Sequence, residues 1–286
     1  MKKQKVWFIT GASKGFGLEI AKAALAAGDK VVATVRSNAD GLRSTLQQDN
    51  DTLVVSLDVT NEQQVKEGVQ NAISRFGRID VLVNNAGYGL LGATEEVSDE
   101  EVRKQYDTNV FGLLNVTRAV LPHMRSQHSG HIINISSLFG YTASAPGFGL
   151  YGSTKFAVEG ISEGLALEVK PLGIHVTAAA PGLFSTNFTS PDAYQPSKVI
   201  LDAYQETVGG VRDVVGQLHG NQPGDPAKLA GVIIQLAASE NPPLHLPIGT
   251  DAVASFKTKT EQMGKEVAEW EAVSSSTDHV KSNQTS

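Results

Sequence analysis

Short runs of apolar residues alternate along the chain with longer segments in which apolar residues recur at helical spacing. The apolar runs predict strands at residues 6–10, 30–35, 53–57, 80–83, 131–135, 174–179 and 244–248. The helical pattern predicts helices at residues 18–27, 100–124 and 226–238, and around Tyr151 and Lys155. Apolar strands separated by helices are typical of a parallel sheet that is covered on both faces. The pattern therefore predicts an α/β fold, a Rossmann-like doubly wound parallel sheet in a single domain.

The segment at residues 182–223 does not fit this alternation. It has a mixed helical signal and carries the scattered aromatic residues Phe184, Phe188, Tyr194 and Tyr204. It is too long for a simple connection in a compact domain, which favours a lid over a site at residues 183–223. We assign residues 1–250 to one Rossmann-like domain, residues 251–273 to a C-terminal helix and residues 274–286 to a polar tail.

Tyr151 and Lys155 stand four residues apart in a predicted helix, so their polar ends can point into one small volume. A free phenol titrates near pH ~10, and an ammonium group beside it favours the phenolate. We therefore expect Lys155 to lower the pKa of Tyr151, so that the phenol can exchange a proton with a substrate oxygen. The alternative interpretation is an accidental pair on a solvated helix face.

The first predicted strand runs into a glycine-rich turn, T-G-A-S-K-G-F-G at residues 10–17, and directly on into a helix. Gly11 permits a sharp turn, Gly15 lets the backbone approach a phosphate, and Gly17 lets the helix pack closely. A helix N-terminus then offers free N–H groups and a positive dipole to an anion. The spacing is G-x-x-x-G-x-G, and not the G-x-G-x-x-G of the general dinucleotide fingerprint. The other candidate cofactor-binding residues of the turn are Ser13, Lys14 and Phe16.

Residues 11–15 also match G-x-S-x-G, the nucleophile elbow of serine hydrolases, with Ser13 as the nucleophile. No H-G-G-G-type loop that would supply an oxyanion hole is visible in the sequence. The hydrolase interpretation also leaves Gly17, Tyr151 and Lys155 without a role. It is kept as an alternative from another class of enzyme.

The end of the second predicted strand bears on the choice of cofactor. An NAD enzyme places an acidic residue there for the ribose 2′-hydroxyl, whereas this strand ends in T-V-R-S with Arg36 and has no acid before Asp40. Together with Lys14 in the glycine turn, Arg36 favours the 2′-phosphate of NADP. The alternative is an exposed Arg36 that binds nothing.

Seven short motifs follow one another in a fixed order. They are T-G-A-S-K-G-F-G at 10–17, L-D-V-T at 57–60, N-N-A-G at 84–87, D-T-N-V at 107–110, I-S-S at 135–137, Y-G-S-T-K at 151–155 and P-G-L-F-S-T at 181–186. Each motif alone is weak. In this order and spacing, they resemble the short-chain dehydrogenase/reductase family.

The resemblance implies roles for two strand ends. Asp58 resembles the residue that contacts the adenine of the cofactor, with Val59 beside it. Asn85, Ala86 and Gly87 resemble the turn that supports the cofactor's ribose. The alternative for this last group is an ordinary turn between a strand and a helix.

The resemblance extends to the proton path and the nicotinamide. Asn109 matches the asparagine at a helix kink that holds a water in a proton path to the lysine; the alternative is a polar residue bonded to its own helix. The segment that cups the nicotinamide is matched by Pro181, Gly182, Phe184 and Thr186.

The catalytic serine departs from the family pattern. Members usually carry it thirteen residues before the tyrosine, and that position holds Leu138 here. An insertion of one residue in the following loop would restore Ser137 to the end of the strand. We expect Ser137 to be the catalytic serine, with Ser136 and Ser144 as alternatives.

Composition excludes several other classes. A net charge of −6 without a basic run argues against nucleic-acid binding, and the absence of cysteine excludes a thiolate metal site. The seven histidines are dispersed, so no metal is expected, and His131, His175 and His245 are interpreted as structural. The apolar run at the N-terminus is too short for a signal peptide and no run suits a membrane helix, which favours the cytoplasm.

Together these features predict an NADP(H)-dependent oxidoreductase that transfers hydride between the nicotinamide and a carbonyl or secondary alcohol. Leu90, Leu91, Phe139 and Phe148 near the expected pocket mouth favour an apolar or bulky substrate. A non-catalytic NADPH-binding regulator is the alternative. The resemblance also implies a homodimer or homotetramer joined through long helices such as that at residues 100–124.

Overall fold

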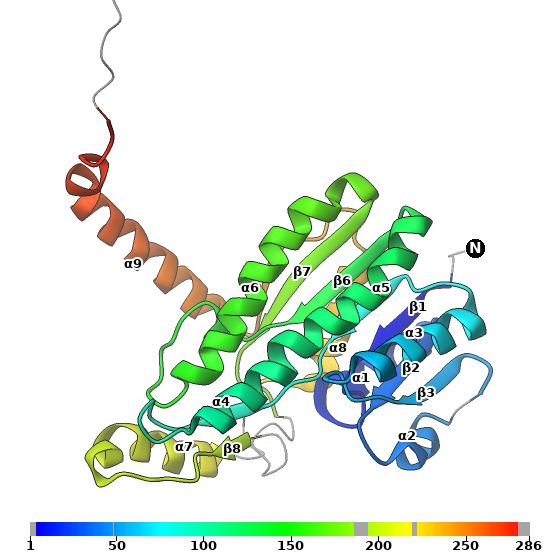
Figure 1. Ribbon diagram of the computed structural model, residues 1–286, viewed down its shortest axis with the longest axis horizontal. Coiled ribbons are helices and arrows are strands. Elements are labelled where there is room, and N and C mark those ends of the chain that lie inside the picture. Colours follow the sequence, from blue (N-terminus) through cyan, green and yellow to red (C-terminus); the bar gives the residue numbers. More distant parts are fainter. Residues whose placement is uncertain (1–3, 48, 186–193, 219–221, 280–286) are drawn as a thin grey trace, which may run out of the picture.

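The computed structural model describes residues 4–47, 49–185, 194–218 and 222–279. One sheet is built from the strands β1 (Val6–Ile9), β2 (Lys30–Val35), β3 (Thr52–Ser56), β4 (Val81–Asn84), β6 (Gly130–Ile135), β7 (Ile174–Pro181) and β9 (His245–Ile248). Their order across the sheet is β3-β2-β1-β4-β6-β7-β9, and every neighbouring pair is parallel (Figure 1). The chain winds outward from β1 in one direction and then in the other, which confirms the predicted doubly wound sheet.

Helices cover both faces of this sheet. One face is covered by α1 (Gly15–Ala26), α2 (Ala39–Leu46) and α8 (Pro226–Ala238). The other face is covered by α3 (Glu62–Phe76), α5 (Leu113–Gln127) and α6 (Gly149–Val169). The predicted strands end within two residues of the observed ones, and α8 occupies its predicted range.

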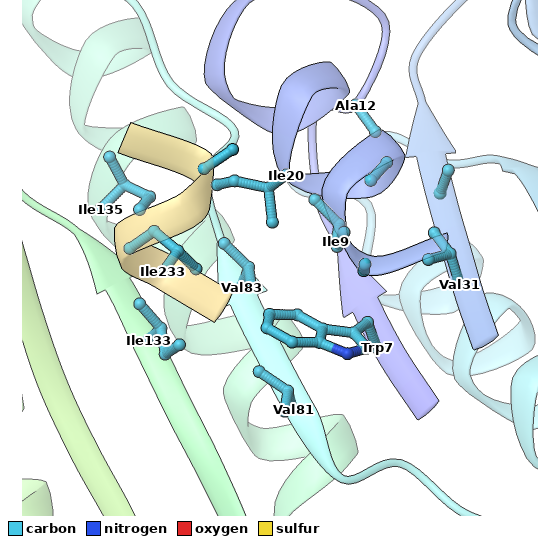
Figure 2. Close-up of a cluster of buried hydrophobic side chains, with 14 of the residues drawn as sticks. Trp7, Ile9, Ala12, Ile20, Val31, Val81, Val83, Ile133, Ile135 and Ile233 are labelled. Carbon is cyan, nitrogen blue, oxygen red and sulfur yellow. The ribbon is translucent and has the colours of Figure 1, made fainter. Parts of the chain in front are cut away.

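The strands are apolar throughout because each face of the sheet has its own core. Successive strand residues point to opposite faces, so β1 gives Trp7 and Ile9 to one cluster and Val6 and Phe8 to the other. Figure 2 shows Trp7 among apolar side chains of neighbouring strands, with Ile233 of α8 covering them. These two cores fix the strand ends on which the candidate site is built.

The helix predicted at residues 100–124 is interrupted. α4 (Asp99–Tyr106) is followed by a π-helical turn at Asp107–Gly112 and only then by α5. A π-helical turn inserts extra backbone into a helix and is frequent at functional sites. Here it contains Asn109, one of the predicted site residues.

The segment predicted as a lid contains regular structure that the sequence pattern did not reveal. β8 (Tyr194–Pro196) pairs in parallel with the short strand β5 (Gly89–Leu91), outside the main sheet. A 3₁₀ turn at Asp202–Tyr204 and a π-helical turn at Gln205–Gly209 lead into α7 (Gly210–Leu218). Of the aromatic residues of this segment, Phe188 lies outside the described residues.

The predicted C-terminal helix is present as α9 (Thr250–Ser275), and it projects away from the sheet (Figure 1). Near its start, the ring of Phe256 stacks on that of Tyr141 with the centroids 4.0 Å apart. Residues 261–279 are all exposed. Within the part of the chain that the structure describes, no helix is both long enough and apolar enough to cross a membrane.

Candidate active site

A cavity of about 830 Å³ lies where the parallel strands of the main sheet end, the position at which open α/β sheets bind ligands. The predicted site residues that line it are Gly11, Ser13, Lys14, Gly15, Phe16, Arg36, Asp58, Val59, Asn85, Ala86, Gly87, Ser137, Tyr151, Lys155, Pro181, Gly182 and Phe184. Gly17 and Asn109 do not line it, and Thr186 lies outside the described residues. Residues far apart in the sequence are thus brought together around one cavity.

The glycine turn after β1 needs its glycines for two separate reasons. Gly11 and Gly15 have φ angles of +64° and +57°, a region that favours glycine. A Cβ atom on Gly17 would lie 2.5 Å from the carbonyl oxygen of Gly11 and 2.6 Å from Nδ2 of Asn85. The turn can therefore bring the N-terminus of α1 to the cavity wall without side chains in the way.

The hydrolase interpretation finds no base at this turn. Ser13 is exposed at the cavity, as a nucleophile would be. None of the histidines in the described part of the chain lines that cavity. A serine nucleophile is activated by an adjacent general base, so the G-x-S-x-G match is best explained as part of the glycine turn.

The end of β2 presents a cation to the cavity. Arg36 and Ser37 line it, both exposed. Asp40, the nearest acid after Arg36 in the sequence, bonds to Arg43 at 2.6 Å on α2. Asp58, at the end of β3, also lines the cavity, and its Oδ1 accepts hydrogen bonds from the backbone N–H and the hydroxyl of Thr60, at 2.9 and 2.7 Å.

Asn85 joins the turn after β4 to the glycine turn. Its Nδ2 donates to the carbonyl oxygens of Thr10 and Gly11, at 2.9 and 3.0 Å. The backbone N–H groups of Asn85 and Ala86 donate to the hydroxyl of Thr10 at 2.9 and 3.0 Å. The conformation of one turn therefore depends on the other.

Asn109 lies buried behind the cavity wall. Its Nδ2 donates to the carbonyl oxygen of Tyr88 at 3.0 Å and to Oγ1 of Thr154 at 3.1 Å, and its Oδ1 accepts from the N–H of Tyr88 at 3.1 Å. These bonds join the π-helical turn to α6 and to the segment after β4. They also explain why an asparagine fits this position better than an apolar residue.

Tyr151, Lys155 and Ser137 meet at one wall of the cavity. Tyr151 and Lys155 lie on the same side of α6, with Nζ 5.9 Å from the centroid of the tyrosine ring. Nζ also donates to the carbonyl oxygen of Ile135 at 2.8 Å. Ser137 hydrogen-bonds to the Tyr151 side chain, while its Oγ accepts the N–H of Phe139 at 3.2 Å.

The geometry separates the three candidate serines. Ser144 is exposed and does not line the cavity, whereas Ser136 and Ser137 both line it. Ser136 Oγ is buried and has no hydrogen-bond partner among the described residues, while Ser137 bonds to Tyr151. The structure therefore favours Ser137, despite the shift of one residue from the family spacing.

A sequence profile described as short chain dehydrogenase matches residues 5–196 of this chain. The chain belongs to the short chain dehydrogenase family. Oxidoreductase BOA17 of Botryotinia fuckeliana is 38% identical over 94% of this chain and 98% of its own length. A 3-ketodihydrosphingosine reductase of Bacteroides thetaiotaomicron is 39% identical over 86% of this chain and 88% of its own length.

Solved structures agree with this membership. A short-chain dehydrogenase from Streptomyces avermitilis is 43% identical, with a TM-score of 0.88 over 96% of this chain and 100% of that one. ElxO, solved with NADP bound, is 30% identical with a TM-score of 0.72, and the match covers 88% of this chain and 100% of that one. A 3-ketoacyl-(acyl-carrier-protein) reductase of Brucella melitensis, solved with NADH, is 28% identical with a TM-score of 0.70, and the match covers 85% of this chain and 96% of that one. The chain is therefore an oxidoreductase of this family, whose members bind NADP(H) or NAD(H).

The electrostatics of this short chain dehydrogenase correct one expectation. Burial raises the pKa of Tyr151 above its usual range, and the hydrogen bond from Ser137 offsets this only in part. Burial lowers the pKa of Lys155 to about 8, opposed by the negative charge of Glu159. The expected net lowering of the Tyr151 pKa is not seen in this structure, because desolvation of the buried phenol outweighs the hydrogen bond from Ser137.

Sequence reasoning missed several residues of the site. Ser37, Tyr88 and Gln195 line the cavity, and Ser37 could have been found as the neighbour of Arg36. Glu159 stands one helical turn after Lys155, a spacing that is visible in the sequence. Its partner His245 is not visible in this way, because 86 residues separate the two.

The three histidines predicted in strands have structural partners, and within the described residues no cluster of His, Cys, Asp or Glu could hold a metal ion. Nε2 of His131 lies 3.0 Å from Oγ1 of Thr177. The ring of His131 packs against that of His175 with the centroids 6.0 Å apart. Nδ1 of His245 lies 2.9 Å from Oε2 of Glu159.

Proposed function

We propose that this protein transfers hydride between NADP(H) and a carbonyl or secondary alcohol on an apolar or bulky substrate. The observation that carries the proposal is the meeting of Tyr151, its hydrogen-bonded partner Ser137 and Lys155 at one wall of the cavity. The glycine turn forms another part of the wall of the same cavity. A site for proton transfer and a site for a dinucleotide thus share one space.

The residues around the cavity fit a dinucleotide with a 2′-phosphate. The left-handed glycines Gly11 and Gly15 leave room for a phosphate at the N-terminus of α1. Arg36 and Lys14 bring positive charge to the same cavity. Asp40 does not line this cavity and is paired with Arg43. Relatives solved with NADP and with NADH show that both cofactors occur in the family, so the choice of NADP(H) rests on Arg36 and Lys14.

In the reductive direction, Tyr151 would donate its hydroxyl proton to the carbonyl oxygen. The bound reduced nicotinamide would supply the hydride to the carbonyl carbon. The raised pKa of Tyr151 keeps the phenol protonated at neutral pH, which suits a proton donor. The hydroxyl of Ser137, which bonds to Tyr151 in this structure, would turn its proton to the developing negative charge on the substrate oxygen.

Lys155 and Asn109 would support this chemistry. Lys155 would bind the ribose of the cofactor and stabilise the phenolate that remains after proton transfer. Asn109, which is bonded to the backbone N–H and the carbonyl oxygen of Tyr88 and to Thr154 of α6, would maintain the path along which the phenol is reprotonated. A contact between Thr186 and the cofactor is part of the same proposal, and it rests on the family resemblance alone.

Apolar side chains beside Tyr151 support the substrate class. Leu138 and Phe139 line the cavity, and Phe139 stacks on Phe148 with the ring centroids 4.6 Å apart. Val208, from the segment proposed as a lid, belongs to the same buried cluster as Tyr151. The Bacteroides relative is named for the reduction of a keto compound, 3-ketodihydrosphingosine. We propose that residues 183–223 close over a substrate of comparable apolar character.

An exposed apolar surface supports the proposed homo-oligomer. Phe111 of the π-helical turn and Phe156 and Leu167 of α6 are 52%, 44% and 78% exposed. Exposed apolar side chains mark an association surface where they form one continuous patch. We propose that Phe111, Phe156 and Leu167 form such a patch and that it joins two copies.

The test is the variant Tyr151→Phe, assayed for NADPH binding and for NADPH oxidation with a panel of ketones. Binding should be kept, while turnover should fall by about 10³-fold or more because the donated proton is missing. Tyr106→Phe is the matched control, because the hydroxyl of Tyr106 bonds to Ser153 at 2.9 Å and does not line the cavity. Near-normal turnover of Tyr151→Phe would contradict the proposal.

The panel also tests the substrate class. Bulky apolar ketones should be reduced faster than small polar sugars, and the opposite ranking would contradict an apolar substrate. NADPH binding without turnover of any ketone or alcohol would instead support a regulator that binds NADPH.

A further inference from the structure

Glu159 is a buried carboxylate that the proposed chemistry does not use. It lies on α6, and only 6% of the residue is exposed. Its Oε1 has no hydrogen-bond partner among the described residues. Burying a carboxylate that is incompletely paired costs free energy, so an interaction with a nearby positive charge is needed to explain it.

Lys155 provides that charge from the preceding turn of the same helix. Residues four apart on a helix share one face, and the charge of Glu159 acts to raise the pKa of Lys155 against the effect of burial. Nζ itself donates to the carbonyl oxygen of Ile135, a neutral group. The ammonium group is thus buried, and Glu159 acts on it through space, since no direct ion pair joins these two described residues.

His245 of β9 holds the carboxylate from the other side. A carboxylate only accepts hydrogen bonds, so Nδ1 of His245 donates to Oε2 of Glu159 across 2.9 Å. Nε2 of the same ring lies 3.4 Å from Oε1 of Glu163, whose side chain is 58% exposed. The titratable neighbours of Glu159 in the described structure are therefore Lys155 and Glu163 on its own helix and His245 on β9.

We propose that Glu159 is the counterion of Lys155, a positioning residue that keeps the ammonium group charged beside Tyr151, and that His245 fixes the Glu159 carboxylate in place. The proposal rests on the function proposed for Lys155. It adds a residue that touches neither substrate nor cofactor and acts through the lysine. The proposal predicts how kcat/KM should depend on pH.

The sign of that dependence follows from the charges. Lys155 loses its proton as pH rises through its pKa, and the negative charge of Glu159 moves this loss to higher pH. The neutral side chain in Glu159→Gln should therefore lower the pKa of Lys155 by about one unit. The decline of kcat/KM on the alkaline side should move to lower pH by the same amount, while activity at pH values well below this decline should change little.

The test has two readouts. The first is the ¹³Cε chemical shift of Lys155 against pH in lysine-labelled protein, assigned with Lys155→Arg, which requires no turnover. The second is the pH profile of kcat/KM. A pKa of Lys155 that is unchanged in Glu159→Gln would overturn the inference, whether or not the enzyme is active. A shifted pKa combined with full turnover of Tyr151→Phe would support the counterion and contradict the proposed function.

Two control variants separate electrostatics from folding. Glu163→Gln removes an exposed carboxylate one turn further along α6 and should leave the pKa of Lys155 unchanged. Glu159→Asp keeps the negative charge, so the pKa of Lys155 in this variant should lie closer to that of the unchanged protein than to that of Glu159→Gln. If Glu159→Asp titrates like Glu159→Gln, or if both variants lower kcat/KM by the same factor at every pH, Glu159 is structural and the inference is overturned.

Discussion

Arg212 of α7 forms an ion pair with Glu96, whose side chain is completely buried. The carboxylate of Glu96 also accepts hydrogen bonds from the N–H groups of Ala93 and Leu201, at 2.7 and 2.9 Å. Burial alone would raise the pKa of Glu96, but these bonds and Arg212 hold it below its usual range. Glu96 thus connects two points of the proposed lid to the segment after β5.

Arg212→Met should loosen the lid. The substitution leaves the buried carboxylate of Glu96 without its cation, which is strongly unfavourable unless the segment moves and admits water. We expect faster limited proteolysis within residues 194–218 and a KM for bulky ketones raised by about tenfold, as weaker closure lowers binding. Arg103→Met is the control, because Arg103 pairs with Asp99 on the exposed face of α4. Equal cleavage rates in both variants would contradict a lid held by Glu96.

Ser137→Ala should reduce turnover far more than Ser136→Ala. Ser137 bonds to Tyr151, so its loss should lower kcat by about 10²-fold if it stabilises the oxyanion. Ser136 Oγ is buried with no partner among the residues described, so removing it should leave activity intact and stability unchanged or slightly higher. Steady-state kinetics and thermal unfolding of both variants check this. The reverse ranking in kcat would assign the catalytic role to Ser136.

Arg36→Ala should weaken the preference for NADPH. A guanidinium group binds phosphate through several charge-assisted hydrogen bonds, so its loss should raise the KM for NADPH by about tenfold or more and leave the KM for NADH nearly constant. Arg43→Ala, on the exposed side of α2, is the matched control. Equal effects of Arg36→Ala on both cofactors would contradict a contact with the 2′-phosphate.

His131 should make the fold sensitive to acid. Burial, assisted by the charges of His175 and Lys5, lowers its pKa to about 3. The unfolded chain takes up a proton on this histidine below pH ~6.5, and the folded chain does not do so until far lower pH. The stability contributed by the neutral ring is therefore complete above pH ~6.5 and is lost as the pH falls, by about 2 kcal/mol at pH ~5.

His131→Gln should remove most of this dependence. Oγ1 of Thr177 donates its proton to the carbonyl oxygen of Pro243, so Nε2 of His131 is the donor in their contact, and a glutamine amide can replace it. Free energies of unfolding from denaturant titrations near pH 7 and pH 5 should differ less in the variant. His279→Gln, at an exposed position, should behave like the unchanged protein. If His131→Gln loses as much stability between pH 7 and pH 5 as the unchanged protein does, groups other than His131 cause that loss.

The sheet and the cavity could be predicted because their signals are local. Each strand of the seven-stranded sheet is a short apolar run, and the order of strands and helices leaves few topologies. The glycine turn and the pairing of Tyr151 with Lys155 are visible for the same reason, since each depends on spacing within one element. The cavity then follows from the rule that the carboxyl ends of parallel strands lie at one edge of the sheet.

The remaining features depend on contacts between distant parts of the chain. Glu96 meets Arg212 across 116 residues and Glu159 meets His245 across 86, and neither pairing leaves a pattern in the sequence. β5 and β8 are three residues long, too short to show alternation. The raised pKa of Tyr151 could not be predicted because it depends on burial of the phenol, which only the packing of distant elements produces.

The stacking of Tyr141 on Phe256 has a practical consequence for work with this protein. Tyr141 follows the turn that carries Leu138 and Phe139 at the cavity, and its hydroxyl also bonds to Oγ1 of Thr260 at 3.0 Å. A purification tag or a surface tether attached after α9 would pull on the helix that this ring holds, and so on the rim of the cavity. An attachment before β1, at the amino ends of the parallel strands, would leave that rim undisturbed.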